Sequence, residues 1–428
     1  MQEISVSNTK KANGTISMPG DKSISHRAII LGAIAEGNTT IKGMLKGEDC
    51  LSTIAVFRKL GTIIEEISDE EIVVYGRGLN GLSKPTGVLD AGNSGTTMRL
   101  VSGLLAGQNF TSTITGDASL CKRPMKRIID PLGKMGAYIT PTHGNLPPLI
   151  IRGTKLKGID YKSKIASAQV KSCLLLAGLY TNGVTSITEP VKSRDHTERI
   201  LSYMGCPVTI DGLRVEVKGR SKIEAKDITV AGDISSAAFF ILCGLLLDGS
   251  IRIKNVGLNP TRTGILKVFE AMGANISVEG ERMICNEPVG DIVVKSSTLK
   301  GISIGSKLVP SLIDEFPILA VAATQAEGVT RISGASELRV KETDRINAIC
   351  SELGRMGAKI EEKSDGMLIH GRTPLKGAIV ESFKDHRMAM SLAIAGLIAE
   401  GKTTIKDTDC INTSFPHFMD KLKSVTSL

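Results

Sequence analysis

The chain has 428 residues, of which 41% are hydrophobic, and this length suits roughly two or three domains with cores of their own. A formal net charge of +9 with 3% aromatic residues and no tryptophan disfavours nucleic-acid binding by base stacking and favours small anionic ligands. The 8 cysteines show no CxxC spacing, and the sequence has neither an apolar signal core nor an apolar run of about 18 residues. We therefore expect a cytoplasmic protein with reduced thiols, no membrane span, no metal and no cofactor.

Two sequence phrases alternate along the chain. In the first, an amphipathic helix ends in a glycine and a β-branched strand follows. Its copies are residues 57–66, 132–140, 201–210, 269–278 and 353–362. In the second, an apolar helix, a glycine turn and a strand follow one another. Its copies are residues 35–44, 181–190, 247–256, 326–335 and 399–408, with a looser one at 106–117. The alternation predicts six α/β units of roughly 70 residues each, three in each of two similar domains.

The sixth unit, at the C-terminus, lacks its closing strand, and we expect the N-terminal residues 3–7 to supply it. Both termini would then lie in one domain, made of residues 1–17 and 234–428, with residues 18–233 as the central domain. Two hinge crossings near 15–20 and 229–233 would suit domain closure over a ligand. A passive solenoid is the alternative, although its repeats usually span only about 20–47 residues.

Polar loops precede most of the buried apolar helices. Free N–H groups and the helix dipole make such N-terminal ends suitable for anions, so we expect a cleft lined by helix N-termini and cations. Each motif alone also fits an ordinary capped helix, with Ser23 or Ser25 as an N-cap. Likewise Asp314 is either an N-cap or a base, and Lys341 and Arg345 would share one face of a helical turn. The loops are residues 20–27, 92–99, 116–125, 167–169, 193–197, 314–317, 341–345 and 385–387.

Taken together, the motifs GDKSISHRA, GNSGTTMR, CKRPM, DEFP, VKETDRI and KDHRMAM resemble those of the enolpyruvyl transferases. The resemblance covers nearly the whole chain and is strongest to the branch that acts on shikimate 3-phosphate, in its more divergent second class. It implies an α/β fold, a two-domain inside-out α/β barrel of six βαβαββ repeats with three per domain. It also implies transfer of the enolpyruvyl group of phosphoenolpyruvate to the 5-hydroxyl of shikimate 3-phosphate in aromatic amino-acid biosynthesis, by a cytoplasmic monomer that glyphosate inhibits.

The resemblance also implies roles for individual residues, carried over motif by motif. Asp314 resembles the base on the 5-hydroxyl, Glu342 the group that moves the proton at C3, and Lys22 a catalytic lysine. The implied shikimate 3-phosphate contacts are Lys22, Ser23, Arg27, Ser167, Gln169, Ser193, Arg194, Asp314 and Lys341. The implied phosphoenolpyruvate and phosphate contacts are Lys22, Asn93, Gly95, Arg123, Gln169, Arg345, His386 and Arg387.

Three positions depart from the family pattern. Glu337 stands where an asparagine is frequent, Ala168 where some members have a second serine, and Thr413 where others have a lysine. One cation near phosphoenolpyruvate is therefore expected to be missing. Glyphosate-tolerant members of the second class can carry alanine in the GNxGT turn, and because Gly95 is kept here we expect sensitivity.

Two other functions are the alternatives. UDP-N-acetylglucosamine enolpyruvyl transferases share the fold but use a cysteine five residues before an Arg-Pro pair. Here Ala118 has that offset from Arg123, and Cys121 lies only two residues before it. A non-catalytic anion-binding repeat protein is the second alternative, although carboxylates such as Asp314, Glu342 and Asp385 would weaken phosphate binding there.

Overall fold

The computed structural model describes residues 2–426 and divides the chain into two compact units. The central unit contains Gly20–Ala231 and Met283–Glu287, and the terminal unit contains the residues up to Pro19, Gly232–Arg282 and those from Pro288 onward. Two chain crossings fall within the expected hinge segments 15–20 and 229–233, whereas the segment Met283–Glu287 was not expected in the central unit. Hinge closure at these crossings stays a prediction, and the expected outer limits at residues 1 and 428 lie outside the described range.

Within the described residues, the central unit holds three four-stranded sheets of one pattern. Their strand orders are β14-β3-β5-β4, β6-β7-β9-β8 and β10-β11-β13-β12, and in each sheet only the first pair is parallel. The strands are β3 (Glu36–Lys42), β4 (Ile63–Glu66), β5 (Glu71–Arg77), β6 (Leu89–Asp90), β7 (Thr111–Thr115), β8 (Tyr138–His143), β9 (Leu146–Arg152), β10 (Asp160–Lys162), β11 (Val184–Thr188), β12 (Val208–Asp211), β13 (Arg214–Lys218) and β14 (Ile228–Thr229).

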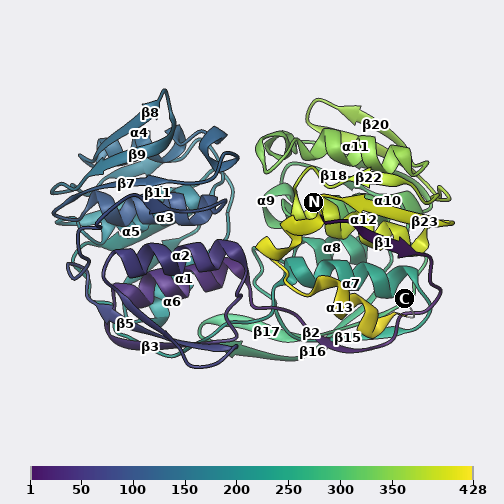
Figure 1. Cartoon of the computed structure of the whole chain (residues 1–428), viewed down its shortest axis with the longest axis horizontal. Coiled ribbons are helices and arrows are strands. Elements are labelled where there is room, and N and C mark those ends of the chain that lie inside the picture. The colour runs from purple at the N-terminus through teal and green to yellow at the C-terminus, as the bar shows by residue number, and fades with distance from the viewer. Residues whose placement is uncertain (1, 427–428) are drawn as a thin grey trace. The chain divides into compact units, whose positions relative to one another are not determined.

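Three apolar helices, one from each repeat, form the middle of the central unit. Almost all residues of α1 (Lys22–Ala33), α3 (Gly95–Ala106) and α5 (Ala168–Gly178) are buried, and the sheets surround them (Figure 1). Each repeat adds a second helix. These are α2 (Glu48–Lys59), α4 (Lys126–Lys134) and α6 (His196–Tyr203), with a short 3-10 helix at Leu120–Lys122. The second helix has an exposed face in α2 and α4 but is mostly buried in α6.

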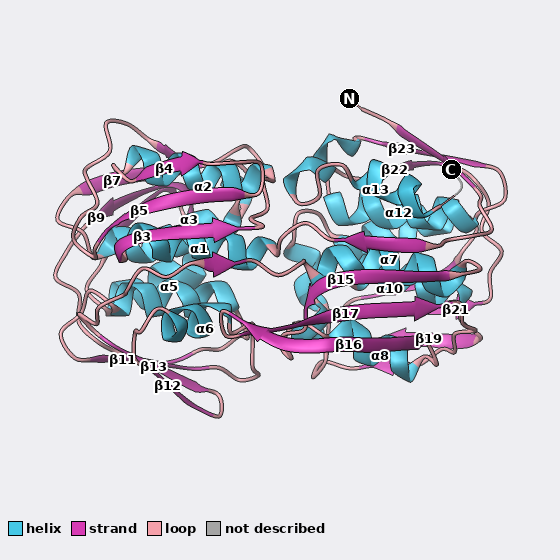
Figure 2. Cartoon of the chain, turned by 90° about the horizontal axis from the view of Figure 1, so that it is seen from below, coloured by secondary structure: helices cyan, strands magenta, loops and turns pink. Residues whose placement is uncertain are grey.

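The terminal unit repeats this plan with the sheets β2-β15-β17-β16, β18-β19-β21-β20 and β22-β23-β1. Figure 2 shows β15, β17 and β16 side by side. The strands are β1 (Ile4–Ser7), β2 (Gly14–Ser17), β15 (Ser250–Gly257), β16 (Asn275–Ile284), β17 (Glu287–Lys295), β18 (Ser303–Ile304), β19 (Gly328–Ile332), β20 (Lys359–Lys363), β21 (Gly366–Gly371), β22 (Ile379–Glu381) and β23 (Lys402–Lys406).

The helices of the terminal unit also divide into buried and amphipathic ones. The buried set is α7 (Ile234–Leu246), α10 (Phe316–Gln325) and α12 (His386–Ile398). The others are α8 (Gly264–Ala271), α9 (Val309–Leu312), α11 (Arg345–Arg355) and α13 (Phe418–Val425), with 3-10 helices η2 (Ser336–Val340) and η3 (Thr408–Thr413). The predicted fold class, six α/β repeats with helices inside and sheets outside, is confirmed.

The N-terminal strand completes the last repeat as expected. β1 pairs antiparallel with β23, with Ile4 opposite Ile405 and Ser7 opposite Lys402. The strands at the two chain crossings also pair with strands that are distant in sequence. β2 pairs in parallel with β15, and β14 pairs in parallel with β3. Segments distant in sequence thus close three of the six sheets.

The glycines of the two phrases have the backbone conformation that the repeats require. Gly61 follows α2 with φ +86°, and Gly401 leads into β23 with φ +91°, a region that favours glycine. The looser copy differs, because Gly107 after α3 has φ −94°. A Cβ on Gly107 would lie 2.3 Å from Cγ of Tyr180, so close packing rather than the turn excludes a side chain there.

Candidate functional site

Asp21, rather than a serine, caps the first buried helix. Its carboxylate accepts a hydrogen bond from the backbone N–H of Ile24 at 3.0 Å, and α1 begins at Lys22. The expected N-cap roles of Ser23 and Ser25 are therefore wrong, because both lie within the first turn. Ser25 instead donates its hydroxyl to the backbone carbonyl of Asp21 at 2.8 Å.

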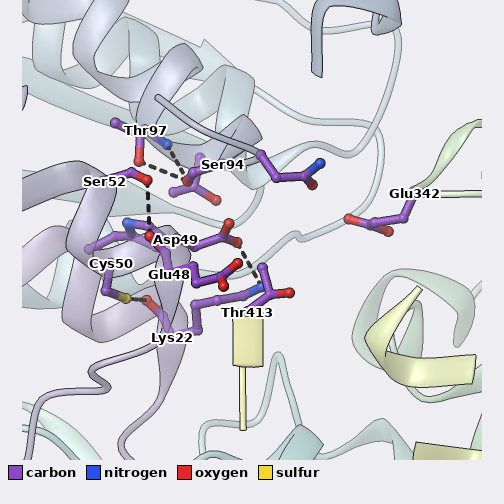
Figure 3. Close-up of polar contacts among 12 residues, drawn as sticks. Lys22, Glu48, Asp49, Cys50, Ser52, Ser94, Thr97, Glu342 and Thr413 are labelled. Carbon is purple, nitrogen blue, oxygen red and sulfur yellow. Dashed lines mark hydrogen bonds and ion pairs between the residues drawn. The ribbon is translucent and has the colours of Figure 1, made fainter. Parts of the chain in front are cut away.

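Lys22 lies beside a carboxylate that the sequence analysis did not single out. Its Nζ is 3.0 Å from Oδ2 of Asp49, in the first turn of α2 (Figure 3). The side chains are 19% and 12% exposed, so the ammonium is held at a partly accessible place. The acidic pair Glu48–Asp49 at the start of a helix was the available sequence signal.

Arg27 is buried and connects three helices of the central unit. Its guanidinium donates to the Ser23 carbonyl at 2.9 Å, to Oγ1 of Thr197 at 2.6 Å and to Oγ of Ser172 at 2.9 Å. Burial lowers the pKa of Arg27 to about 10, and the carboxylates of Glu198 and Asp21 act in the opposite direction. The arginine is therefore rigidly placed among α1, α5 and α6.

The start of α3 brings together Asn93 and Arg123. Oδ1 of Asn93 accepts from Nη2 of Arg123 at 2.7 Å, while its Nδ2 donates to Asp117 at 2.7 Å. Ser94 caps α3 by accepting from the N–H of Thr97 at 3.1 Å. A Cβ on Gly95 would lie 2.6 Å from Nη1 of Arg99, so this glycine leaves the space that the arginine fills.

Gln169 joins the start of α5 to α3. Its Oε1 accepts from Nη1 of Arg99 at 2.8 Å, and its Nε2 donates to Oγ1 of Thr96 at 3.1 Å. Ser167 caps α5 through the N–H of Val170 at 3.4 Å. The N-terminal ends of α3 and α5 therefore lie side by side, and Arg99 belongs to this group although the sequence analysis gave it no role.

A buried chain of uncharged groups runs through the same helix ends. Nδ1 of His26 is 2.7 Å from Oγ1 of Thr53, which is 2.7 Å from Oγ1 of Thr97, and Thr97 donates to Ser94 at 2.7 Å. Burial first, and then Lys22 and Arg27, hold the pKa of His26 well below its usual value. The imidazole is therefore neutral at neutral pH and acts as a structural link.

Ser193 is buried in the loop between β11 and α6. Its hydroxyl donates to Oε1 of Glu189 at 2.6 Å, and the same oxygen accepts from the backbone N–H of Ser167 at 3.2 Å. Arg194 follows in this loop and is partly exposed. We call the N-terminal ends of α1, α3 and α5, with their flanking loops, the central cluster.

A second group, the terminal cluster, lies in the terminal unit at the N-terminal ends of α7, α10, α11 and α12. Arg345 is its centre and is 1% exposed. Its guanidinium contacts Asp385 at 2.8 Å and Glu342 at 2.7 Å and lies 3.5 Å from Asp314. Burial alone would lower the pKa of Arg345, but these three carboxylates outweigh it and raise that pKa.

Asp314 precedes α10 and does not cap it. The N-cap position is Glu315, whose carboxylate accepts from the Ser235 hydroxyl of α7. The Asp314 carboxylate instead lies 3.5 Å from Arg345 and 3.5 Å from Nη2 of Arg387. Nη1 of Arg387 donates to the backbone carbonyl of Asp314 at 3.3 Å. The N-cap reading of Asp314 is therefore wrong, and its role as a base stays a prediction.

The KETDR segment is not one helical turn. Lys341 ends the 3-10 helix η2 in extended conformation, and Asp344 starts α11 by accepting from the N–H of Asn347 at 3.1 Å. The expected i, i+4 face of Lys341 and Arg345 is therefore wrong. Burial lowers the pKa of Lys341, while the charges of Asp314 and Glu342 oppose this shift.

The remaining candidates lie at the start of α12 and in η3. Asp385 caps α12 by accepting from the N–H of Arg387 at 2.9 Å, and His386 is buried in the first turn. Thr413 donates its hydroxyl to the carbonyl of Cys410, so this position supplies no cation. The expected cations Lys22, Arg27, Arg123, Arg345 and Arg387 lie beside carboxylates or polar acceptors of the protein itself.

The described part of the chain contains neither a metal-binding group nor a membrane-spanning helix. Among residues 2–426, no group of three His, Cys, Asp or Glu side chains is arranged to hold a metal ion. No helix in the part of the chain that the structure describes is long and apolar enough to cross a membrane. The 8 cysteines, all of them in the described range, are free thiols.

Comparisons with known proteins agree over the whole length. Residues 6–422 match the family EPSP synthase (3-phosphoshikimate 1-carboxyvinyltransferase). The 3-phosphoshikimate 1-carboxyvinyltransferase of Bacillus thuringiensis (strain Al Hakam) is 54% identical over 416 residues, which is 97% of each chain. The EPSP synthase structure from Acinetobacter baumannii has a TM-score of 0.90 and 46% identity, covering 100% of this chain and 98% of that one.

A more distant structure shares only the fold. The enolpyruvyl transferase NikO from Streptomyces tendae has a TM-score of 0.81 at 17% identity, covering 98% of this chain and 96% of that one. The family match and the relatives that are more than half identical carry the assignment. The chain belongs to the EPSP synthase (3-phosphoshikimate 1-carboxyvinyltransferase) family.

Proposed function

We propose that the two clusters divide the reaction of this family, in which the enolpyruvyl group of phosphoenolpyruvate moves to the 5-hydroxyl of shikimate 3-phosphate. The observation that carries the division is the convergence of Asp314 and Glu342 on Arg345, at 3.5 and 2.7 Å. Two carboxylates that share one buried cation suit the two proton transfers that the reaction needs. Family membership favours this acceptor, and nothing in the comparisons supports the UDP-sugar or the non-catalytic alternative.

The central cluster is proposed to bind the substrates. Its serines and Arg27 suit shikimate 3-phosphate, and Arg123 with its partner Asn93 suits phosphoenolpyruvate, because guanidinium and helix N–H groups bind oxyanions well. Lys22 is proposed to act at the 5-hydroxyl, oriented by Asp49. The further proposed contacts are Ser23, Gly95, Gln169 and Arg194 in this cluster and Lys341, His386 and Arg387 in the terminal cluster.

The terminal cluster is proposed to move the protons. Asp314 takes the proton of the 5-hydroxyl as that oxygen bonds to C2 of phosphoenolpyruvate, and Glu342 gives a proton to C3. A tetrahedral intermediate results. Its C2–O bond to phosphate then breaks, C3 returns its proton to Glu342, and the proton on Asp314 leaves with the phosphate. Atoms and charges balance, and the enol ether and inorganic phosphate are the products.

The arginine pairs give this proposal a specific order of events. In the structure the donors of Arg345 and Arg387 face carboxylates of the protein. The carboxylate and phosphate groups of phosphoenolpyruvate bind these guanidinium groups more strongly than the protein carboxylates do, because they carry more charge in total and bind in bidentate fashion. When the substrate binds, its anionic groups would replace Asp314 and Glu342 as partners of the arginines. The two carboxylates would then be available for proton transfer.

The activity is tested by measuring phosphate release from phosphoenolpyruvate with each possible acceptor. We expect turnover with shikimate 3-phosphate and none with UDP-N-acetylglucosamine or without an acceptor. Turnover with the UDP sugar alone would contradict the proposal, and binding of both anions without any phosphate release would favour the non-catalytic alternative.

We further propose that glyphosate competes with phosphoenolpyruvate and that the enzyme is a cytoplasmic monomer. Gly95 supports the first point, because it leaves the start of α3 without a side chain beside Arg99 and Arg123. Inhibition assays at several phosphoenolpyruvate concentrations test it, and an inhibition constant far above the Michaelis constant for phosphoenolpyruvate would contradict it. Light scattering of the purified chain tests the monomer.

A further inference from the structure

A buried triad of charges lies directly behind the central cluster. Lys171 of α5 places its Nζ 2.7 Å from Oε2 of Glu189 and 2.8 Å from Oε1 of Glu198. The three side chains are only 2%, 3% and 1% exposed. Burying three charges is costly unless they are well paired, and apolar residues of similar size would serve a core at least as well. The triad therefore calls for an explanation beyond core packing.

Glu189 is the member of the triad whose carboxylate holds the proposed substrate contacts, and Lys171 also donates to the backbone carbonyl of Ser193 at 3.5 Å. Its Oε1 accepts from the hydroxyl of Ser193 at 2.6 Å and from the N–H of Ser167 at 3.2 Å. Its Oε2 also accepts from the N–H of Ser193 at 3.3 Å. One carboxylate thus fixes Ser167 and Ser193, two of the serines that are proposed to bind shikimate 3-phosphate, and it holds the loop after β11 against the start of α5.

A carboxylate at this place creates an electrostatic problem. Shikimate 3-phosphate brings a phosphate group of up to two negative charges, and a like charge in a poorly solvated site repels it strongly. Lys171 supplies the compensating charge within hydrogen-bond distance of Glu189. Burial alone would lower the pKa of Lys171, but the carboxylates of Glu198 and Glu189 outweigh this and raise that pKa. Lys171 therefore stays protonated at neutral pH.

We propose that Glu189 and Lys171 are positioning residues for shikimate 3-phosphate: Glu189 orients Ser167 and Ser193, and Lys171 neutralises Glu189 so that the phosphate group is not repelled. Glu198 completes the environment of Lys171, and its carboxylate pairs with the ammonium rather than with Ser167 or Ser193. The inference rests on the proposed function, since it assumes that these two serines meet this substrate.

The experiment compares the Michaelis constants for both substrates in the full-length enzyme. Lys171→Met leaves Glu189 uncompensated, and we expect the Michaelis constant for shikimate 3-phosphate to rise about tenfold or more, because an unpaired buried charge is strongly unfavourable. The constant for phosphoenolpyruvate should change by less than about threefold, because its proposed ligands Arg123 and Asn93 are paired with each other at the start of α3. Glu189→Gln keeps the shape without the charge and should have a smaller effect than Lys171→Met.

The double variant Lys171→Met/Glu189→Gln separates charge from packing. If Lys171 acts by neutralising Glu189, the double variant should bind shikimate 3-phosphate better than Lys171→Met alone, although it carries more substitutions. Glu198→Gln is the matched control, because it removes a buried carboxylate from the same ammonium without touching Ser167 or Ser193. Its Michaelis constants should stay within about threefold of the parent values.

Two results would overturn the inference: a double variant no better than Lys171→Met, or a Glu198→Gln variant as impaired as Glu189→Gln. If Lys171→Met does not fold, as thermal unfolding would reveal, the Glu189→Gln and Glu198→Gln pair decides alone. The parent enzyme separates the two levels of the argument. Absence of turnover with shikimate 3-phosphate overturns the proposed function, whereas normal turnover with unchanged constants in every variant overturns only the inference.

Discussion

The central and terminal clusters are built from the same repeat, yet they pair their charges differently. In the central cluster, neutral groups link several helix ends, as in the series from His26 through Thr53 and Thr97, although Asp21 caps α1 and Asp49 pairs with Lys22. In the terminal cluster, a single arginine gathers three carboxylates, Asp314, Glu342 and Asp385. Hydroxyl and amide groups at a helix N-terminus leave its anion-binding capacity intact, whereas carboxylates there supply groups that exchange protons. This difference underlies our proposal that one fold provides a binding half and a reacting half.

The strongest test of this comparison is Asp314→Asn. The amide keeps the size of the side chain but cannot take the 5-hydroxyl proton, so we expect kcat to fall by about 10²–10⁴. The Michaelis constants should change much less, and binding of shikimate 3-phosphate by calorimetry should persist. A kcat within tenfold of the parent value would show that Asp314 is not the base and that the terminal cluster is not the reacting half.

Glu342→Gln should have the next largest effect. Loss of proton delivery at C3 is expected to lower kcat by about 10²-fold, again with smaller changes in the Michaelis constants. Glu337→Gln is the matched control, because Glu337 lies in the adjacent η2 helix and is also partly exposed. Rapid-quench kinetics on both variants would locate the slow step. Equal losses in the two would attribute the effect to the local fold rather than to proton transfer.

Much of the fold was predictable because its information is local and repeated. The glycine that ends each amphipathic helix and the apolar run of each buried helix recur, so six units could be counted and β1 could be assigned to β23. Asp344 could also have been predicted as an N-cap, because aspartate often caps a helix by accepting from the N–H three residues later, here that of Asn347. The charges of KETDR suggested instead that the segment forms one face of a helical turn. Because Asp344 caps α11, the helix begins at Arg345 and does not include Lys341.

The pairings of charges were not predictable in the same way. Lys22 pairs with Asp49 and Lys171 pairs with Glu198, and each pair joins two different helices. The spacing of residues along the sequence does not predict how such helices pack against each other. A candidate cation is visible in a sequence, but its counterion usually is not. For that reason motifs could name the candidate site residues, whose roles stay predictions, whereas the groups that pair with their cations became visible only in the structure.

Arg27→Lys tests the binding half and should act on affinity. Lysine keeps the charge but cannot make the three separate contacts with Ser23, Thr197 and Ser172. We expect the Michaelis constant for shikimate 3-phosphate to rise about tenfold, the equivalent of about 1.4 kcal/mol, with kcat nearly unchanged. Steady-state assays with each substrate varied in turn provide the measurement. A variant that loses kcat while keeping its Michaelis constants would assign Arg27 to the reacting half.

The smallest expected effect is on how folding stability depends on pH, through the uncharged hydrogen-bonded groups that begin at His26 in the central cluster. Because the pKa of His26 is lowered in the folded protein, the unfolded chain binds the proton first as pH falls below about 6.5. Folding stability should therefore decrease toward acid, by at most about 1.4 kcal/mol per pH unit from this residue. His26→Gln should remove that contribution at a cost of about 1 kcal/mol at pH 7, because its hydrogen bond to Thr53 is weakened. Urea unfolding at pH 7.5 and 5.5 gives the comparison. An equally steep loss toward acid in parent and variant would mean that another group titrates there and that the link between α1 and α2 is insensitive to pH.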